Sequence, residues 1–321
     1  MLVLQSFQKL TIVDGTMAKA KLLGISAVVV LVASVAYHFQ STAIMRLDAM
    51  KLKNAHMSLQ GQTALVVGGT AGIGEGIALR LAQAKANVVI AGRNADRGKS
   101  IVRNMQTINP SGTYRFLPVD AQLIGNIRGL SAEVPHLDKL VLTQGIATIQ
   151  GFTPTSEGID QKLALHYYGR MAFIEQFLPT LRQSTHSPRV LSVLSAESSY
   201  SLKNAADAAG FYNDLMLDAY SAANDQIAFG HAAPGFVATN WGTEMPWAIR
   251  MLLKPLKYLL AKSKADCAEF MADFLLREDV AGGQLYLTDA VGEPAAVTTA
   301  HPPAAVAFLA KHTQDRLKYV Q

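Results

Sequence analysis

Hydrophobic and polar positions along the chain follow two different spacings, and the clearest change between them occurs within residues 64–82. An unbroken apolar run at 64–67 leads into a glycine-rich turn, and apolar residues then recur at helical spacing, from Ile77 to Leu81. This pattern predicts a buried strand, a tight turn and a helix, which together open a βαβ unit. We expect the rest of the domain to be built around this unit.

The same change of spacing repeats toward the C-terminus. Short apolar runs predict strands at 87–91, 114–120, 137–143, 189–195, 226–232 and 284–288, and helical patterns cover 98–107, 158–183, 205–221, 265–277 and 304–319. Strands that alternate with helices form a parallel sheet that is covered on both faces. The sequence therefore predicts an α/β, doubly wound Rossmann fold with a mainly parallel sheet of about seven strands.

An uncharged apolar segment precedes this domain. No residue between Lys21 and Arg46 carries a formal charge, and residues 22–42 are long enough to cross a bilayer as a helix of roughly 1.5 Å rise per residue. Basic residues flank both ends of the segment, so the orientation stays open. A cleaved signal sequence, with small residues at 34–36, is one alternative, and a buried core helix or a targeting peptide is another.

We accordingly predict two parts of the chain. Residues 1–56 form a leader with a hydrophobic, membrane-spanning helix, and residues 57–321 form the Rossmann-type α/β domain. We expect a membrane location through a single-pass anchor, with the endoplasmic reticulum as one candidate compartment.

Composition narrows the class of protein further. Half of the chain is hydrophobic and 17% is charged, which predicts a large core and argues against disorder. The net charge is +5, but residues 1–60 hold six lysines and arginines against two aspartates, so four of the five net charges lie there. The nearly neutral remainder argues against a nucleic-acid partner. The single cysteine, Cys267, excludes an intramolecular disulfide and a cysteine metal cluster, and the histidine spacing predicts no metal site.

The glycines of the central turn carry the first chemical signal. Gly68, Gly72 and Gly74 lack a Cβ atom, so the backbone can bend sharply and approach a ligand closely. With Ile73 they open the predicted helix, whose N-terminus favours negative charge. The pattern predicts binding of a dinucleotide pyrophosphate, with a purely structural turn as the alternative.

The end of the next predicted strand bears on the choice of dinucleotide. In such folds a carboxylate at this position binds the 2′-hydroxyl of NAD, whereas an arginine accommodates the 2′-phosphate of NADP. The strand at 87–91 is followed by Gly92 and Arg93, with no carboxylate. The sequence therefore favours NADP over NAD, and the alternative is that Arg93 is an ordinary solvated loop residue.

These motifs, in this order, resemble the short-chain dehydrogenase/reductase family over about residues 59–288. The turn at 68–74 looks like the family's glycine motif, and residues 143–145 occupy the place of its Asn-Ala-Gly turn with only the glycine kept. The resemblance implies an adenine contact for Asp120 and a nicotinamide contact for the segment 234–239. The implied cofactor-binding residues are Gly68, Gly72, Ile73, Gly74, Arg93, Asp120, Thr143, Gly145, Pro234, Gly235 and Thr239.

The resemblance also implies hydride transfer between a nicotinamide and a carbonyl or alcohol. In that chemistry a tyrosine moves the proton, a lysine lowers the pKa of the tyrosine, and a serine binds the substrate oxygen. Ser195 fits the serine, and Tyr200 is nearly in register for the tyrosine. Tyr212 and Tyr220 are alternatives, although neither is followed by a lysine.

Two positions depart from the family pattern. Lys203 follows Tyr200 by three residues rather than four, and Asn204 and Ala205 occupy the expected lysine positions. Residues three and four apart share a helix face, so Lys203 remains the predicted partner. His166 stands where the family commonly places an asparagine, and it is predicted to take over hydrogen bonding or proton transfer there. The alternative for His166 is a histidine packed within a helix.

The segment 244–260 follows the predicted nicotinamide contacts, where the family has its variable substrate lid. Its Leu, Met and Trp residues favour an apolar substrate wall, a membrane-surface helix or core packing. We predict an NADP(H)-dependent oxidoreductase whose catalytic domain acts on a carbonyl or secondary alcohol of a lipophilic substrate. The resemblance implies a homodimer or a tetramer. The alternative is a non-catalytic dinucleotide-binding sensor or scaffold.

Overall fold

The structure of the protein, a computed structural model, describes residues 43–146, 148, 150–194, 205–239, 247, 251, 261–295 and 301–319. Contacts divide the chain into Met1–Ala49 and Met50–Gln321. Only residues 43–49 of the first part are described, and the predicted membrane-spanning helix at 22–42 lies outside the described residues. Within the described ranges, no helix is both long enough and apolar enough to cross a membrane. The predicted boundary between residues 56 and 57 stays a prediction.

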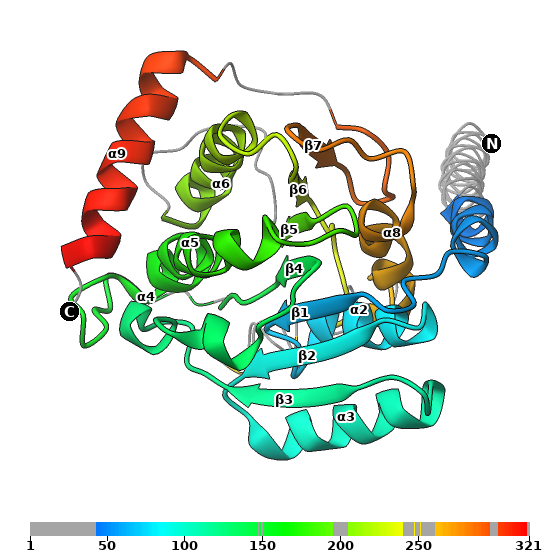
Figure 1. The fold of residues 1–321 in the computed structure, drawn as a ribbon. Helices are drawn as coiled ribbons and strands as arrows, with labels where there is room; N and C mark the ends of the chain where they lie inside the picture. Colours follow the sequence, from blue (N-terminus) through cyan, green and yellow to red (C-terminus); the bar gives the residue numbers. More distant parts are fainter. Residues whose placement is uncertain are drawn as a thin grey trace, which may run out of the picture. The chain divides into compact units, whose positions relative to one another are not determined.

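Seven strands form a sheet in which every neighbouring pair is parallel, in the order β3-β2-β1-β4-β5-β6-β7 (Figure 1). They are β1 (Thr63–Val67), β2 (Asn87–Gly92), β3 (Tyr114–Pro118), β4 (Lys139–Leu142), β5 (Arg189–Val193), β6 (Ala228–Ala232) and β7 (Leu285–Thr288). From β1 the chain first adds strands on one side of the sheet, β2 and β3, and then on the other side, beginning with β4. In such sheets a ligand crevice is expected where the direction changes, between β1 and β4. The predicted doubly wound fold is confirmed.

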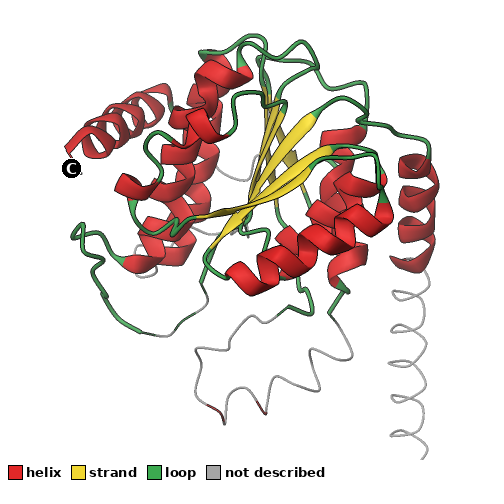
Figure 2. Ribbon diagram, turned by 60° about the horizontal axis from the view of Figure 1, so that its bottom comes forward, coloured by secondary structure: helices red, strands yellow, loops and turns green. Residues whose placement is uncertain are grey.

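Helices cover both faces of the sheet (Figure 2). On one face lie α2 (Gly72–Gln83), α3 (Ala95–Ile108) and α8 (Lys264–Leu276); on the other lie α4 (Gln161–Leu163), a π-helix (Ala164–Tyr168), α5 (Gly169–Leu181) and α6 (Ala205–Ala222), with α9 (Pro303–Tyr319) against α6. Two short 3₁₀ turns, Ile124–Asn126 and Leu130–Glu133, join β3 to β4. Residues 43–55 are also helical.

The helix predicted over 158–183 needs a correction. Its first residues form a turn, and a π-helix at Ala164–Tyr168 then separates the short α4 from α5. The amide of Gly169 donates to the carbonyl oxygen of Ala164, five residues earlier. A Cβ atom on Gly169 would overlap the carbonyl oxygen of Ala121, so the backbones approach as closely as only glycine allows. Short π-helices of this kind are frequently found at functional sites.

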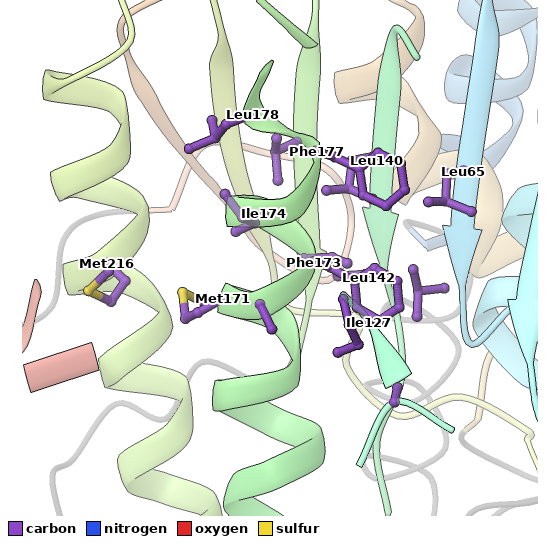
Figure 3. Close-up of a cluster of buried hydrophobic side chains, with 14 of the residues drawn as sticks. Leu65, Ile127, Leu140, Leu142, Met171, Phe173, Ile174, Phe177, Leu178 and Met216 are labelled. Atoms are coloured by element: carbon purple, nitrogen blue, oxygen red, sulfur yellow. The ribbon is translucent and has the colours of Figure 1, made fainter. Parts of the chain in front are cut away.

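The main core lies between β4 and α5 (Figure 3). Phe173 and Phe177 stack on each other, one helical turn apart, and are directed toward Leu140 and Leu142 of β4. All four side chains are fully buried. Burial of side chains of this size contributes roughly 1.5–3 kcal/mol each, so α5 is held firmly against the strand whose end belongs to the site described next.

Candidate active site

The turn that follows β1 packs directly on the turn that follows β4. Gly68 has φ +80°, and its amide donates to the carbonyl oxygen of Ala91 at 2.9 Å. A Cβ atom on Gly68 would lie 2.7 Å from Oγ1 of Thr143 and 2.8 Å from the amide nitrogen of Gln144. This position therefore requires glycine for both its backbone conformation and its packing.

Gly72 and Gly74 of the same turn are also constrained. A Cβ atom on Gly74 would overlap Oγ1 of Thr143 and lie 2.5 Å from the carbonyl oxygen of Gly68. Gly72 has φ +58°, and a Cβ atom there would lie 3.1 Å from Cγ2 of Thr239. The glycine turn is thus brought against segments that are about 70 and 170 residues away in sequence.

Helix α2 begins at this turn without a side-chain cap. The residue that precedes it, Ala71, offers no side-chain acceptor, and the amide of Glu75 donates to the carbonyl oxygen of Ala71. The amides of Gly72, Ile73 and Gly74 lie in the first turn of α2, where backbone N–H groups have no carbonyl partner within the helix. Together with the positive end of the helix dipole, such amides favour a phosphate group.

The ends of β2 and β3 lie beside the glycine turn. A Cβ atom on Gly92 would lie 2.9 Å from Oγ1 of Thr70, so the end of β2 touches the turn, and the next side chain, Arg93, is exposed. Asp120 follows β3 and is half-buried; its Oδ1 accepts a hydrogen bond from the amide of Gln122 at 3.1 Å. This side of the edge thus offers an exposed guanidinium and a carboxylate.

The segment after β4 is fixed to β1 and to the π-helix. The amide and the hydroxyl of Thr143 both donate to the carbonyl oxygen of Val67, at 2.9 and 2.7 Å. A Cβ atom on Gly145 would lie 2.9 Å from Nε2 of His166. The Thr143 hydroxyl therefore joins two strand ends, and Gly145 leaves room for the imidazole.

His166 lies within the π-helix with its ring buried. Its Nε2 accepts a hydrogen bond from the amide of Ile146 at 2.9 Å, and its Nδ1 has no hydrogen-bond partner among the described residues. Burial, together with the nearby charge of Arg170, lowers the pKa of His166 to about 4. At neutral pH the ring is therefore uncharged with its proton on Nδ1. This state favours the predicted hydrogen-bonding role over proton transfer through an imidazolium.

The segment that follows β6 also reaches the glycine turn. Gly235 has φ +65°, and a Cβ atom there would lie 2.7 Å from Cβ of Ala290. The carbonyl oxygen of Pro234 lies 3.9 Å from the sulfur of the buried Cys267 on α8. The chain then reaches Thr239 beside Gly72, so the predicted nicotinamide segment and the glycine turn share one edge.

Comparison with known proteins identifies the family. The sequence profile described as short chain dehydrogenase matches residues 62–246, which is more than half of the chain. The chain belongs to the short-chain dehydrogenase family.

Curated relatives of this short-chain dehydrogenase include several oxidoreductases. An oxidoreductase of Emericella nidulans is 34% identical over 215 residues, covering 60% of this chain and 64% of the relative. The polyprenol dehydrogenase of Mus musculus is 26% identical over 260 residues, covering 73% of this chain and 78% of the relative. The match spans less than two thirds of the length of two of these relatives. It covers 64% of the Emericella nidulans protein and 60% of an oxidoreductase of Emericella variicolor.

Solved structures have the same fold as this short-chain dehydrogenase. RhlG of Pseudomonas aeruginosa, in complex with NADP, has a TM-score of 0.58 at 22% identity, and the match covers 74% of this chain and 98% of RhlG. An alcohol dehydrogenase of Thermococcus sibiricus, in complex with 5-hydroxy-NADP, has a TM-score of 0.59 at 18% identity, with 73% and 99% covered. These similarities establish the fold.

The structure brings the predicted cofactor residues of this short-chain dehydrogenase together at one edge, although their contact with a cofactor stays a prediction. The predicted catalytic residues Ser195, Tyr200 and Lys203 lie outside the described residues, as does most of 244–260. β5 ends at Val193, two residues before Ser195.

Sequence reasoning missed three buried polar residues next to His166. Arg170 of α5, Ser192 of β5 and Asn213 of α6 form a hydrogen-bonded group at the carboxyl ends of β4 and β5. The one available signal was Arg170 itself, the one residue with a formal charge in the largely apolar run at 163–174. When the neighbours of a charged residue on a helix are buried, the charged side chain needs buried hydrogen-bond partners of its own. Those partners come from other elements.

Proposed function

We propose that this short-chain dehydrogenase is an NADP(H)-dependent oxidoreductase that interconverts a carbonyl and a secondary alcohol of a lipophilic substrate. The observation that carries the proposal is the cradle formed by Gly68, Gly72 and Gly74. At each of these glycines a side chain would clash with a neighbour or strain the backbone, and the turn opens onto an uncapped helix N-terminus. A cradle of this kind fits a pyrophosphate.

The residues around the cradle fit a nicotinamide dinucleotide. The exposed Arg93 follows β2 where the 2′-position of the adenosine ribose is expected, and it would pair with a 2′-phosphate. Asp120 would contact the adenine, and Pro234, Gly235 and Thr239 would hold the nicotinamide end. When bound, the dinucleotide supplies or accepts the hydride.

The family resemblance assigns the proton transfer to residues that follow β5 in the chain. Ser195 would hydrogen-bond the substrate oxygen, Tyr200 would donate or accept the proton, and Lys203 would lower the pKa of Tyr200. His166 would offer its Nδ1–H group as a hydrogen-bond donor near the segment after β4. Its depressed pKa supports this role, because an imidazole that stays neutral keeps a fixed donor across physiological pH.

A lipophilic substrate and a membrane location are supported by independent observations. Large apolar side chains are exposed in this part of the chain: Phe152, on the segment that follows β4, is 74% exposed, and Phe236, on the segment that follows β6, is 37% exposed. Further along the chain, Trp247 is 76% exposed and Met251 is 60% exposed. Relatives from Mus musculus and Homo sapiens are polyprenol dehydrogenases, named for a lipid alcohol. We further propose that the uncharged segment at 22–42 anchors the protein in a membrane and that the chain forms a homodimer.

The first test is cofactor binding by the purified full-length chain in detergent micelles. NADPH and NADH are titrated while the intrinsic fluorescence of Trp241 and Trp247 is followed. We expect saturable binding with NADPH preferred, because Arg93 stands in place of a carboxylate. A folded chain that bound neither dinucleotide would refute the proposal.

The second test separates an enzyme from a sensor or scaffold. Turnover of decan-2-one and butan-2-one with NADPH is compared between wild type and Tyr200→Phe. We expect the wild type to prefer decan-2-one, and we expect Tyr200→Phe to bind NADPH normally while losing turnover. NADPH binding without turnover of either ketone, of decan-2-ol with NADP or of a polyprenol with NADP would favour the sensor. Preference for the short ketone would refute the lipophilic substrate.

A further inference from the structure

Arg170 is buried at the start of α5, four residues after His166, with 1% of its surface exposed. Its Nη1 donates to the carbonyl oxygens of Leu142 and Val193, both at 3.0 Å, and to Oγ of Ser192 at 2.7 Å. Its Nη2 donates to the carbonyl oxygen of Gln144 at 2.7 Å. One guanidinium thus binds the last residues of β4 and β5 and the segment that leaves β4.

These partners differ from those of most buried arginines. A buried guanidinium is normally paired with a carboxylate, because removing its charge from water is costly. In the described part of the chain, all the hydrogen-bond acceptors of Arg170 are neutral and no carboxylate forms an ion pair with it. Burial lowers the pKa of Arg170 to about 9, which still leaves the group charged at neutral pH. A charged guanidinium that is kept in the core without a carboxylate partner points to a requirement for the fixed arrangement of its N–H donors.

The contacts of Arg170 continue into a closed group around His166. The hydroxyl of Ser192 donates to Oδ1 of Asn213 at 3.0 Å, and Nδ2 of Asn213 donates to the carbonyl oxygen of His166 at 2.8 Å. The amide of Ile146, which follows Gln144 by two residues, donates to the ring of His166. The ends of β4 and β5, α6 and the π-helix are therefore fixed to one another through Arg170.

We propose that Arg170 is a positioning residue of the reaction, a role that rests on the proposed oxidoreductase activity. The planar guanidinium has several donors in a fixed arrangement, which sets the separation between the chain leaving β4 and the chain leaving β5. The first carries Gly145 and the backbone that holds His166, and the second continues to Ser195. A lysine cannot reproduce this arrangement, because its ammonium group presents donors from a single point.

The test compares Arg170→Lys and Ser192→Ala with wild type and with Arg182→Lys. Arg182 lies at the other end of α5, where its side chain donates to Asn224, so its replacement controls for an arginine-to-lysine change on the same helix. Turnover of decan-2-one with NADPH is measured per folded, NADPH-binding molecule. Ser192→Ala removes one hydroxyl and covers the case in which Arg170→Lys fails to fold.

We expect Arg170→Lys to lower kcat on the order of 10- to 100-fold, with KM and the NADPH Kd within about threefold of wild type. Ser192→Ala should lower kcat about three- to tenfold, and Arg182→Lys should leave it unchanged. The double variant Arg170→Lys with Ser192→Ala should resemble Arg170→Lys alone, since both changes break one network.

The outcomes separate this inference from the proposed function. If Arg170→Lys and Ser192→Ala lower only the thermal stability and keep the kcat of wild type per folded molecule, Arg170 is purely structural and the inference is wrong. If the wild type itself turns over none of the substrates named above, the proposed oxidoreductase function fails, and the positioning role fails with it.

Discussion

Gly74 and Thr143 are packed so closely that a Cβ atom on Gly74 would overlap the hydroxyl oxygen of Thr143. That hydroxyl already donates to the carbonyl oxygen of Val67 at 2.7 Å, and the same Cβ atom would lie 2.5 Å from the carbonyl oxygen of Gly68. Neither neighbour can move without disturbing the join between β1 and β4. The cradle is thus held rigidly by the contact between these two residues.

Replacing Gly74 by alanine should therefore damage both binding and stability. We expect Gly74→Ala to weaken NADPH binding by more than about tenfold and to lower the free energy of unfolding by about 1–3 kcal/mol, the usual effect of overpacking. The measurements are an NADPH titration and urea unfolding. Gly151→Ala is the matched control, because a Cβ atom there would meet nothing within 4 Å. Unchanged NADPH affinity in Gly74→Ala would mean that the cradle does not hold the pyrophosphate.

Arg93 should determine the preference between the two dinucleotides. We expect Arg93→Ala to weaken NADPH binding about tenfold, which corresponds to about 1.4 kcal/mol, and to leave NADH binding unchanged, because only NADPH carries the 2′-phosphate. Isothermal titration of both dinucleotides measures this effect. Arg103→Ala removes a second exposed arginine, on α3, and serves as the control. Equal losses for NADPH and NADH would assign Arg93 to a general electrostatic role instead.

The buried ring of His166 should make stability depend on pH. Burial lowers the pKa of His166 from the ordinary value of 6.5 to about 4, so the unfolded chain binds a proton between these values and the folded chain does not. The contribution of His166 to stability is therefore complete above pH 6.5 and is lost progressively as the pH falls toward 4.

Urea unfolding at pH 7, 5.5 and 4.5 checks this prediction. We expect the free energy of unfolding of His166→Gln to depend on pH less steeply than that of wild type, by on the order of 1 kcal/mol per pH unit below 6.5. His136→Gln controls for the loss of an exposed imidazole. Parallel curves for His166→Gln and wild type would show that folding does not shift the pKa of His166, which would contradict the prediction.

The hydroxyls of Tyr167 and Thr313 should stabilise the docking of α9. They lie 2.5 Å apart, and Tyr167 is only 1% exposed. Thr313→Val leaves the Tyr167 hydroxyl without this partner, so we expect the free energy of unfolding to fall by about 1–3 kcal/mol. In the double variant Tyr167→Phe with Thr313→Val, the loss should be smaller than the sum of the two single losses. Additive losses in urea unfolding would rule out coupling between the two hydroxyls.

The alternation of elements was predictable from sequence because it depends on local spacing. Each of the seven strands was predicted to within two residues of its ends, since buried parallel strands are short apolar runs bounded by polar or glycine residues. The glycine turn was predictable for a similar reason, because glycine marks positions where a side chain does not fit. The π-helix was not, because the contact that accompanies it, between Gly169 and Ala121, joins residues distant in sequence.

The sequence by itself therefore determined the doubly wound fold, the position of the glycine cradle and the candidate residues at the ends of the strands. The tertiary structure alone decided that Gly74 and Thr143 share one space, that the ring of His166 is neutral, and that Arg170 binds the ends of two strands. The physical reason is the range of the interactions involved. Periodicity and glycine placement act within a few residues, whereas packing overlap, burial of a charge and its hydrogen-bond partners depend on elements that meet only when the chain is folded.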